Sequence, residues 1–176
     1  MKYISLILCT IILIGILVFG GINSNLSTTD NNQYLRIHIR ANSNSEIDQN
    51  VKYKIKDSIV DALIPILSNC QTKESAYETL SNQLNYIENI ADNILMENNF
   101  NYKSKAKLAY ENFPTRTYGD LTLESGFYDA LILELGSGTG DNWWCVVYPP
   151  LCFVNGSNNV NTFKSRILEI INNFFD

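Results

Sequence analysis

The feature that most constrains this chain is an uncharged, almost wholly apolar run close to its start. No charged residue lies between Lys2 and Asp30, and residues 4–22 read ISLILCTIILIGILVFGGI. One positive charge before a long apolar run is typical of an export signal, or of a membrane anchor of roughly 20 residues. We therefore expect residues 1–22 to be a signal peptide or a signal anchor. Either one would carry the rest of the chain across a membrane.

The rest of the chain is long enough for one folded domain. Residues 23–33 are polar and lack periodicity, which predicts a linker, and residues 34–176 remain for the domain. Without Lys2 the chain carries 12 basic and 18 acidic side chains, a net charge of −6. That balance gives no general attraction for nucleic acid, so we expect no nucleic-acid partner.

The first part of the domain predicts one strand and two helices. Apolar and basic residues alternate over residues 34–40, which indicates a half-buried strand with a basic outer side. The side chains on that outer side are Arg36, His38 and Arg40. Ser45 is placed to cap a helix that runs to about Leu67. Thr72 is placed to cap a second, longer helix that ends near Glu97.

The second part of the domain predicts clustered strands and a last helix. The strands are expected over residues 102–110, 128–135 and 143–148, and the helix over residues 160–175. Short links between these strands predict antiparallel pairing. The segment GSGTG at residues 136–140 predicts a glycine hairpin, because no helix follows it as a phosphate-binding loop would require.

Strands clustered between helices predict an α+β domain of two layers. We expect a mixed or mostly antiparallel sheet of about four to five strands, packed against two to three helices, behind an N-terminal hydrophobic helix.

The chain offers few residue combinations that could carry catalysis. His38 is the single histidine, which excludes a metal site built from several histidines. A cysteine–histidine pair would need Cys70, Cys145 or Cys152 beside His38, and none of these lies in a recognisable nucleophile motif. No carboxylate pair has the pattern of a glycosidase or an aspartic protease. We predict no catalytic residue, no metal site and no cofactor.

Cys145 and Cys152 allow two interpretations. They flank the segment VVYPPL, whose prolines can turn the chain back on itself. In an oxidising compartment the two cysteines could form a disulfide, which would stabilise the fold by about 2–3 kcal/mol through loop entropy. Two buried free thiols are the other interpretation.

The side chains expected to recognise a partner form three groups. They are the basic side of the first strand, one arginine in the segment FPTRTYG, and an aromatic and proline-rich block near residue 145. An exposed tryptophan beside prolines makes a good anchor for an interface. The candidate partner-binding residues are Arg36, His38, Arg40, Arg116, Trp143, Trp144, Pro149 and Pro150.

Two blocks of this sequence resemble the stage II sporulation protein R family. The first block is LRIHIRANSNS at residues 35–45, followed by Asp48 and Gln49. The second block comprises FPTRTYG at 113–119, GFY at 126–128, GTGDNWWC at 138–145 and YPPLCF at 148–153. The blocks extend over nearly the whole predicted domain.

The resemblance implies a signalling protein without enzyme activity. Family members are made in the forespore and exported across its membrane into the space that faces the mother cell. There they activate a membrane-embedded aspartic protease, the stage II sporulation protein GA, which processes the precursor of sigma factor E. We expect that protease as the partner, and a membrane contact through residues 1–22 if they stay uncleaved. The alternative is an exported small hydrolase that acts on cell wall or peptide.

Overall fold

The computed structural model describes residues 31–153 and 164–175, and the predicted export segment at residues 1–22 lies outside these ranges. Within them, no helix is both long and apolar enough to cross a membrane. The elements in chain order are η1 (Asn31–Gln33), β1 (Leu35–Arg40), α2 (Glu46–Leu67), α3 (Lys73–Ser81), α4 (Leu84–Glu97), β2 (Ser104–Phe113), β3 (Arg116–Tyr118), β4 (Leu121–Leu123), β5 (Gly126–Leu135), β6 (Asn142–Tyr148), η2 (Leu151–Phe153) and α5 (Lys164–Phe175).

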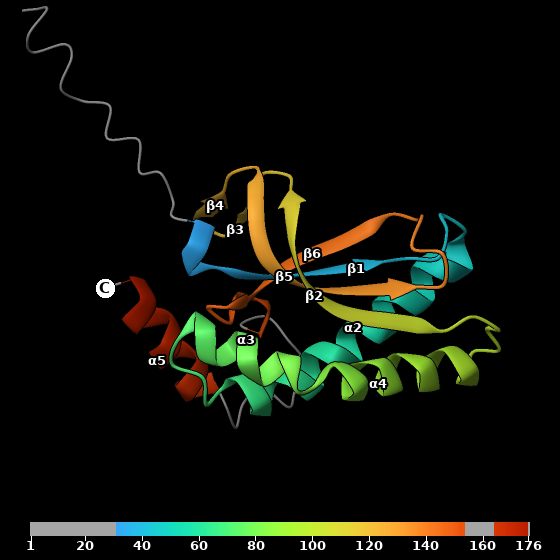
Figure 1. The fold of residues 1–176 in the computed structure, drawn as a ribbon, viewed down its shortest axis with the longest axis horizontal. Coiled ribbons are helices and arrows are strands. Elements are labelled where there is room, and N and C mark those ends of the chain that lie inside the picture. The colour runs from blue at the N-terminus through green and yellow to red at the C-terminus, as the bar shows by residue number, and fades with distance from the viewer. Residues whose placement is uncertain (1–30, 154–163, 176) are drawn as a thin grey trace, which may run out of the picture.

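A mixed sheet of four strands forms the framework of the domain. Its order is β2-β5-β1-β6, with β1 parallel to β5 and antiparallel to β6, and with β2 antiparallel to β5. The α-helices cover one face of this sheet, whereas the small sheet of β3 and β4 lies on the other side near one end (Figure 1). This arrangement confirms the predicted α+β fold with a mixed sheet. The described part contains four α-helices, more than the two to three expected.

Strand β1 is buried on both faces, so the prediction of a half-buried strand is wrong. Leu35, Ile37 and Ile39 pack against the helices in the main hydrophobic core. On the opposite face Arg36 and His38 are buried as well. The alternation assigned the side chains to the correct faces. It did not reveal that the second face is covered, because the covering side chains come from distant strands.

The first helix begins and ends as predicted, but the second predicted helix is two helices. The Ser45 side chain caps α2, which ends at Leu67, and Thr72 caps α3 in a reciprocal capping box with Ser75. Helix α3 then stops, and α4 starts three residues later. At the break the Asn82 side chain bonds the carbonyl oxygen of Glu78, a local bond that competes with continued helix.

The segment at residues 136–141 is not a hairpin, which corrects a second prediction. Strands β5 and β6 both pair with β1 and not with each other, so the segment crosses the end of β1. Gly136 has a φ of +56°, and a Cβ there would collide with the Asn42 side chain. A Cβ on Gly140 would collide with the backbone of Ser43. These glycines let the crossing segment lie directly on the loop that follows β1.

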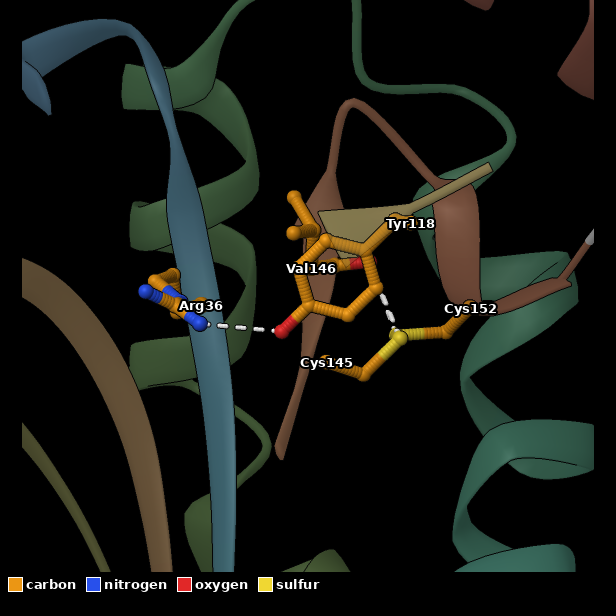
Figure 2. Close-up of a disulfide and its surroundings, with 5 residues drawn as sticks. All are labelled: Arg36, Tyr118, Cys145, Val146 and Cys152. Atoms are coloured by element: carbon orange, nitrogen blue, oxygen red, sulfur yellow. Dashed lines mark hydrogen bonds between the residues drawn. A yellow bond between two sulfur atoms is a disulfide. The ribbon is translucent and has the colours of Figure 1, made fainter. Parts of the chain in front are cut away.

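Cys145 and Cys152 form a disulfide that joins β6 to η2 (Figure 2). Their Cα atoms are 5.9 Å apart, within the usual range for a bridge. Pro149 and Pro150, between β6 and η2, are buried. The structure therefore favours the disulfide over the two free thiols that the sequence had left as an alternative.

Loss of the disulfide is expected to destabilise the domain measurably. The two cysteines are seven positions apart, and the loop-entropy relation gives about 2–3 kcal/mol for such a ring. Urea unfolding of a Cys145→Ser/Cys152→Ser variant should show that loss. Reductant should lower the stability of the wild type by a similar amount and leave the double variant unchanged. Equal stability of the wild type with and without reductant would contradict the expectation.

Candidate functional site

The residues of the two sequence blocks gather at two adjoining places around β1. One is an aromatic cluster on the sheet face opposite the helices, formed by Phe113, Tyr118, Tyr128 and Trp144 around β1. The other is a loop interlock, in which the loop after β1 (residues 41–45) contacts the segment between β5 and β6 (residues 136–141). Segments about 95 positions apart in the chain are thus neighbours at this site.

Arg36 is held inside the aromatic cluster. The carbon of its guanidinium lies 4.3 Å from the ring centre of Phe113 and 4.8 Å from that of Tyr128. One nitrogen, Nη2, donates a hydrogen bond of 2.9 Å to the Tyr118 hydroxyl (Figure 2). The side chain is fully buried, and its Nε and Nη1 have no hydrogen-bond partner among the described residues. Ring faces therefore stabilise the buried positive charge.

His38 lies beside Arg36 on the same face and stacks on Trp144. The two ring centres are 3.7 Å apart, and the His38 side chain is 2% exposed. Burial lowers the pKa of His38 to about 4, assisted by the positive charge of Arg40 and opposed by Asn142 and Glu111. At neutral pH the ring is therefore uncharged. His38 Nδ1 lies 3.6 Å from a carboxylate oxygen of Glu111, just beyond hydrogen-bond distance. In the described part of the chain neither ring nitrogen has a hydrogen-bond partner, so no hydrogen bond links His38 to a cysteine sulfur as a cysteine hydrolase would need.

A ring of charges borders the aromatic cluster where the sheet face opens to solvent. Arg40 donates to Glu134 at 2.7 Å and to Glu111 at 2.6 Å, and Lys107 also donates to Glu134. Burial alone would raise the pKa of Glu134, but Lys107 and Arg40 lower it. Arg40 and both acids are about one quarter exposed, so these pairs order the surface more than they stabilise the fold.

The loop interlock is built from direct hydrogen bonds between the two blocks. The carbonyl oxygen of Asn42 accepts from the hydroxyls of Ser137 at 2.6 Å and Thr139 at 2.9 Å. The side-chain oxygen of Asn42 accepts from the backbone N–H of Ser137, and that of Asn44 accepts from the N–H of Asp141. The Asn-rich run after β1 therefore serves to fix the segment that leads into β6.

Asp48 on α2 holds the loop after β1 in place. Its carboxylate accepts hydrogen bonds from the Ser43 hydroxyl at 2.5 Å, the Asn42 amide at 3.0 Å and the Tyr102 hydroxyl at 2.5 Å. Burial would raise the pKa of Asp48, but these hydrogen bonds lower it overall. Ser45 and Asp48 form only half of a capping box: the Asp48 N–H donates to the Ser45 hydroxyl, but the Ser45 N–H donates to the Ser43 hydroxyl and not to Asp48. No motif in the sequence indicates that Tyr102 bonds Asp48.

Lys52 is a further buried charged group, and no pattern in the sequence indicates its burial. Its side chain is 1% exposed, and its ammonium donates to the Gln49 amide oxygen at 2.7 Å and to the backbone carbonyl of Asp141 at 3.0 Å. Burial lowers the pKa of Lys52, and the nearby charge of Asp141 opposes the shift. Lys52 thus ties α2 to the segment before β6.

The structure separates the eight candidate partner-binding residues by accessibility. Four of them are buried, namely Arg36, His38, Pro149 and Pro150. The other four reach the surface: Arg40, Trp143 and Trp144 are partly exposed, and Arg116 on β3 is exposed. The basic side of β1 is therefore no continuous surface stripe. Only its last member, Arg40, reaches solvent.

Burial of His38 should make the stability of the domain depend on pH. Its pKa is about 4 in the folded state and near 6.5 when unfolded, so the unfolded state binds more protons between these values. Stability is therefore complete above pH 6.5 and falls as the pH drops toward 4, by about 3 kcal/mol in all. Urea unfolding between pH 7 and pH 4 should show this slope. The slope should be much shallower in His38→Phe, and equal slopes would contradict the assignment.

Asp48 should contribute more to stability than an exposed acid on the same helix. Asp48→Asn removes the charge that three side-chain donors share, and we expect a loss of about 2–4 kcal/mol. Asp57→Asn is the matched control, because Asp57 is 69% exposed and forms a surface ion pair with Lys56. Its effect should stay within about 0.5 kcal/mol. Thermal or urea unfolding would measure both, and similar losses would contradict the anchoring role.

Comparison with known proteins agrees with the resemblance of the two blocks. The family model described as stage II sporulation protein R matches residues 31–158. Stage II sporulation protein R of Bacillus subtilis (strain 168) is 34% identical over 126 residues, which are 72% of this chain and 56% of that relative. The chain thus spans little more than half the length of this curated relative, and no solved structure matches it. The chain belongs to the stage II sporulation protein R family.

Proposed function

We propose that this chain is an exported sporulation signal made in the forespore. In this proposal it crosses the forespore membrane into the intermembrane space, where it is either released or anchored by residues 1–22. There it activates the membrane-embedded aspartic protease, stage II sporulation protein GA, and so leads to processing of the sigma factor E precursor. Family membership supports the proposal, as does the apolar run at the start of the chain.

The observation that carries the proposal is the use of the motif residues to hold one shape. Arg36 is enclosed by aromatic rings, Asp48 collects three side-chain donors, and Asn42 bonds Ser137 across the loop interlock. The charged and polar side chains of the two blocks thus make their contacts within the domain. A rigid domain with a fixed surface is what a protein ligand requires, because little ordering entropy is then lost on binding.

A ligand activates its receptor only by binding the active state more tightly than the inactive one. Moving a receptor from 1% to 99% active requires about 10⁴-fold preference, or about 5.5 kcal/mol. An exposed ion pair with the receptor, such as Arg40 could form, contributes about 0–1 kcal/mol, which is too little. Aromatic anchors contribute more, so we assign the main contacts to Trp143 and Trp144, with Arg116 as a further candidate.

Activation can be tested by reconstitution in a bacterium that does not sporulate. Cells would carry the full chain, the protease and the sigma factor E precursor, and processing would be read by immunoblot. We expect processing only when the chain is present, and none when residues 1–22 are deleted. Processing that needs no protease would favour the hydrolase alternative, and processing that ignores the chain would contradict the proposal.

Single substitutions would locate the activating surface in the same cells. Trp144→Ala should lower processing by about ten-fold, because it removes an aromatic anchor worth more than 1 kcal/mol. Tyr86→Ala is the matched control, since Tyr86 is an exposed aromatic residue on α4 in the helical layer. Circular dichroism would verify that both variants fold. Undiminished processing by Trp143→Ala and Trp144→Ala together would contradict the surface assignment.

A further inference from the structure

The two outer strands of the sheet are protected to different degrees. On β2 the outward N–H groups of Ser104 and Ala106 are bonded by Asp92 and Glu88 of α4, at 2.7 and 2.8 Å. Lys105, which is 75% exposed, adds charge to the same strand. Capping by side chains and exposed lysines are common ways to keep an edge strand from pairing with another chain. The edge at β2 is thus closed at Ser104 and Ala106.

The direction of the main-chain groups on β6 follows from β2 by alternation, because the groups of successive residues point to opposite neighbours. The N–H of Ala106 points away from the sheet, so the groups of Lys107 point toward β5. Lys107 lies opposite Ile132 in a register without shifts. Ile132 therefore points toward β2, and the next residue, Leu133, points toward β1.

The same alternation continues across β1. Leu133 is level with Ile39, and in a parallel ladder a residue bonds the two neighbours of its partner. His38 therefore points its groups toward β5, and Ile39 points toward β6. Ile39 lies opposite Trp143 in the antiparallel ladder. Trp143 accordingly points back to β1, and the N–H and C=O groups of Trp144 point away from the sheet.

A contact at the other end of β6 gives the same direction. The carbonyl oxygen of Val146 lies 2.8 Å from Sγ of Cys152 on η2, outside the ladder with β1 (Figure 2). Val146 and Trp144 are two residues apart and so point to the same side. The disulfide thus holds η2 against the outer edge of β6 at Val146. The edge at Asn142 to Trp144 is left uncovered by η2.

This stretch of edge lacks the protection seen on β2. Among residues 31–153 and 164–175, no bond from outside the ladder reaches the main-chain groups of Asn142 or Trp144. No charged side chain lies between Asn142 and Tyr148, so β6 itself carries no charge that would repel an approaching strand. The half-buried rings of Trp143 and Trp144 stand on opposite faces of the strand and flank the open groups.

We propose that the outer edge of β6 at residues 142–144 takes up an extended segment of the partner protein as an added strand. Only an extended main chain presents donors and acceptors at the spacing of this edge, and the two tryptophans would bind its apolar side chains. The open stretch is only about 10 Å long. Pairing with a second copy would therefore bury far less than the roughly 1,200 Å² of a stable interface. The inference rests on the proposed function, because it assigns the segment to the protease.

Residue-resolved amide hydrogen exchange on the full chain tests the inference, measured alone and with the purified protease in detergent. We expect the Trp144 amide to exchange rapidly in the free chain and at least about ten-fold more slowly in the complex. The Ala106 amide is the internal control. Glu88 bonds it in the free chain, so its exchange rate should not change.

A pair of substitutions at one position tests the main-chain bond itself. Asn142→Pro removes the outward N–H at the first residue of β6, where proline is tolerated, whereas Asn142→Ala removes only the side chain. The proline variant should bind the protease at least about ten-fold more weakly than the alanine variant. Equal affinities of two folded variants would overturn the inference. If the proline variant does not fold, the exchange measurement decides.

The outcomes separate failure of this inference from failure of the proposed function. A complex that forms and is active while the Trp144 amide still exchanges rapidly would overturn the added strand alone. A Trp144 amide already slow in the free chain would also overturn it. In that case, dependence on concentration would point to a second copy, and independence would point to another part of this chain. Absence of both complex and activation would overturn both proposals.

Discussion

A guanidinium group buried among aromatic rings is the constraint around which the rest of this domain is arranged. Among the described residues Arg36 has one hydrogen bond, to Tyr118, and otherwise contacts the rings of Phe113 and Tyr128. A buried charge is tolerated only where its surroundings replace the lost hydration. Here the replacement comes from β2, β3 and β5 together, so these strands must be in place before Arg36 can be buried on β1. Burial of Arg36 on β1 thus goes together with a second hydrophobic core on this face of the sheet.

That second core packs the sheet face opposite the main helical layer. The aromatic cluster closes one end of the face, and the loop interlock fixes the end of β1 and the approach to β6. The disulfide then fixes η2 against the far half of β6. The accessible candidates are the ionic border around Arg40, Arg116 on β3, and the edge of β6 with its two tryptophans. The recognition surface that we propose is the edge of β6 at residues 142–144, between the loop interlock and the part of β6 that η2 covers.

The local elements of this fold could be predicted from the sequence, but their neighbours could not. Alternation assigned the two faces of β1, and Ser45 and Thr72 marked the starts of α2 and α3. The sequence does not reveal that β1 lies between β5 and β6, because this pairing joins segments about 95 to 110 positions apart. A glycine-rich link fits a hairpin equally well. The same long-range coverage buries Arg36 and His38, which a local pattern assigns to the surface. Trp144 was identified as a candidate, but only the sheet order shows that it lies on an open edge.

The structure of the full chain bound to its protease partner is the most direct test of this account, and electron cryo-microscopy could provide it. The account predicts that Arg36 and His38 stay buried in the aromatic cluster, and that the partner lies against β6 and the rings of Trp143 and Trp144. A complex in which the aromatic cluster opens, and Arg36 or His38 contacts the partner directly, would contradict the central claim that these residues build the domain and do not carry its message.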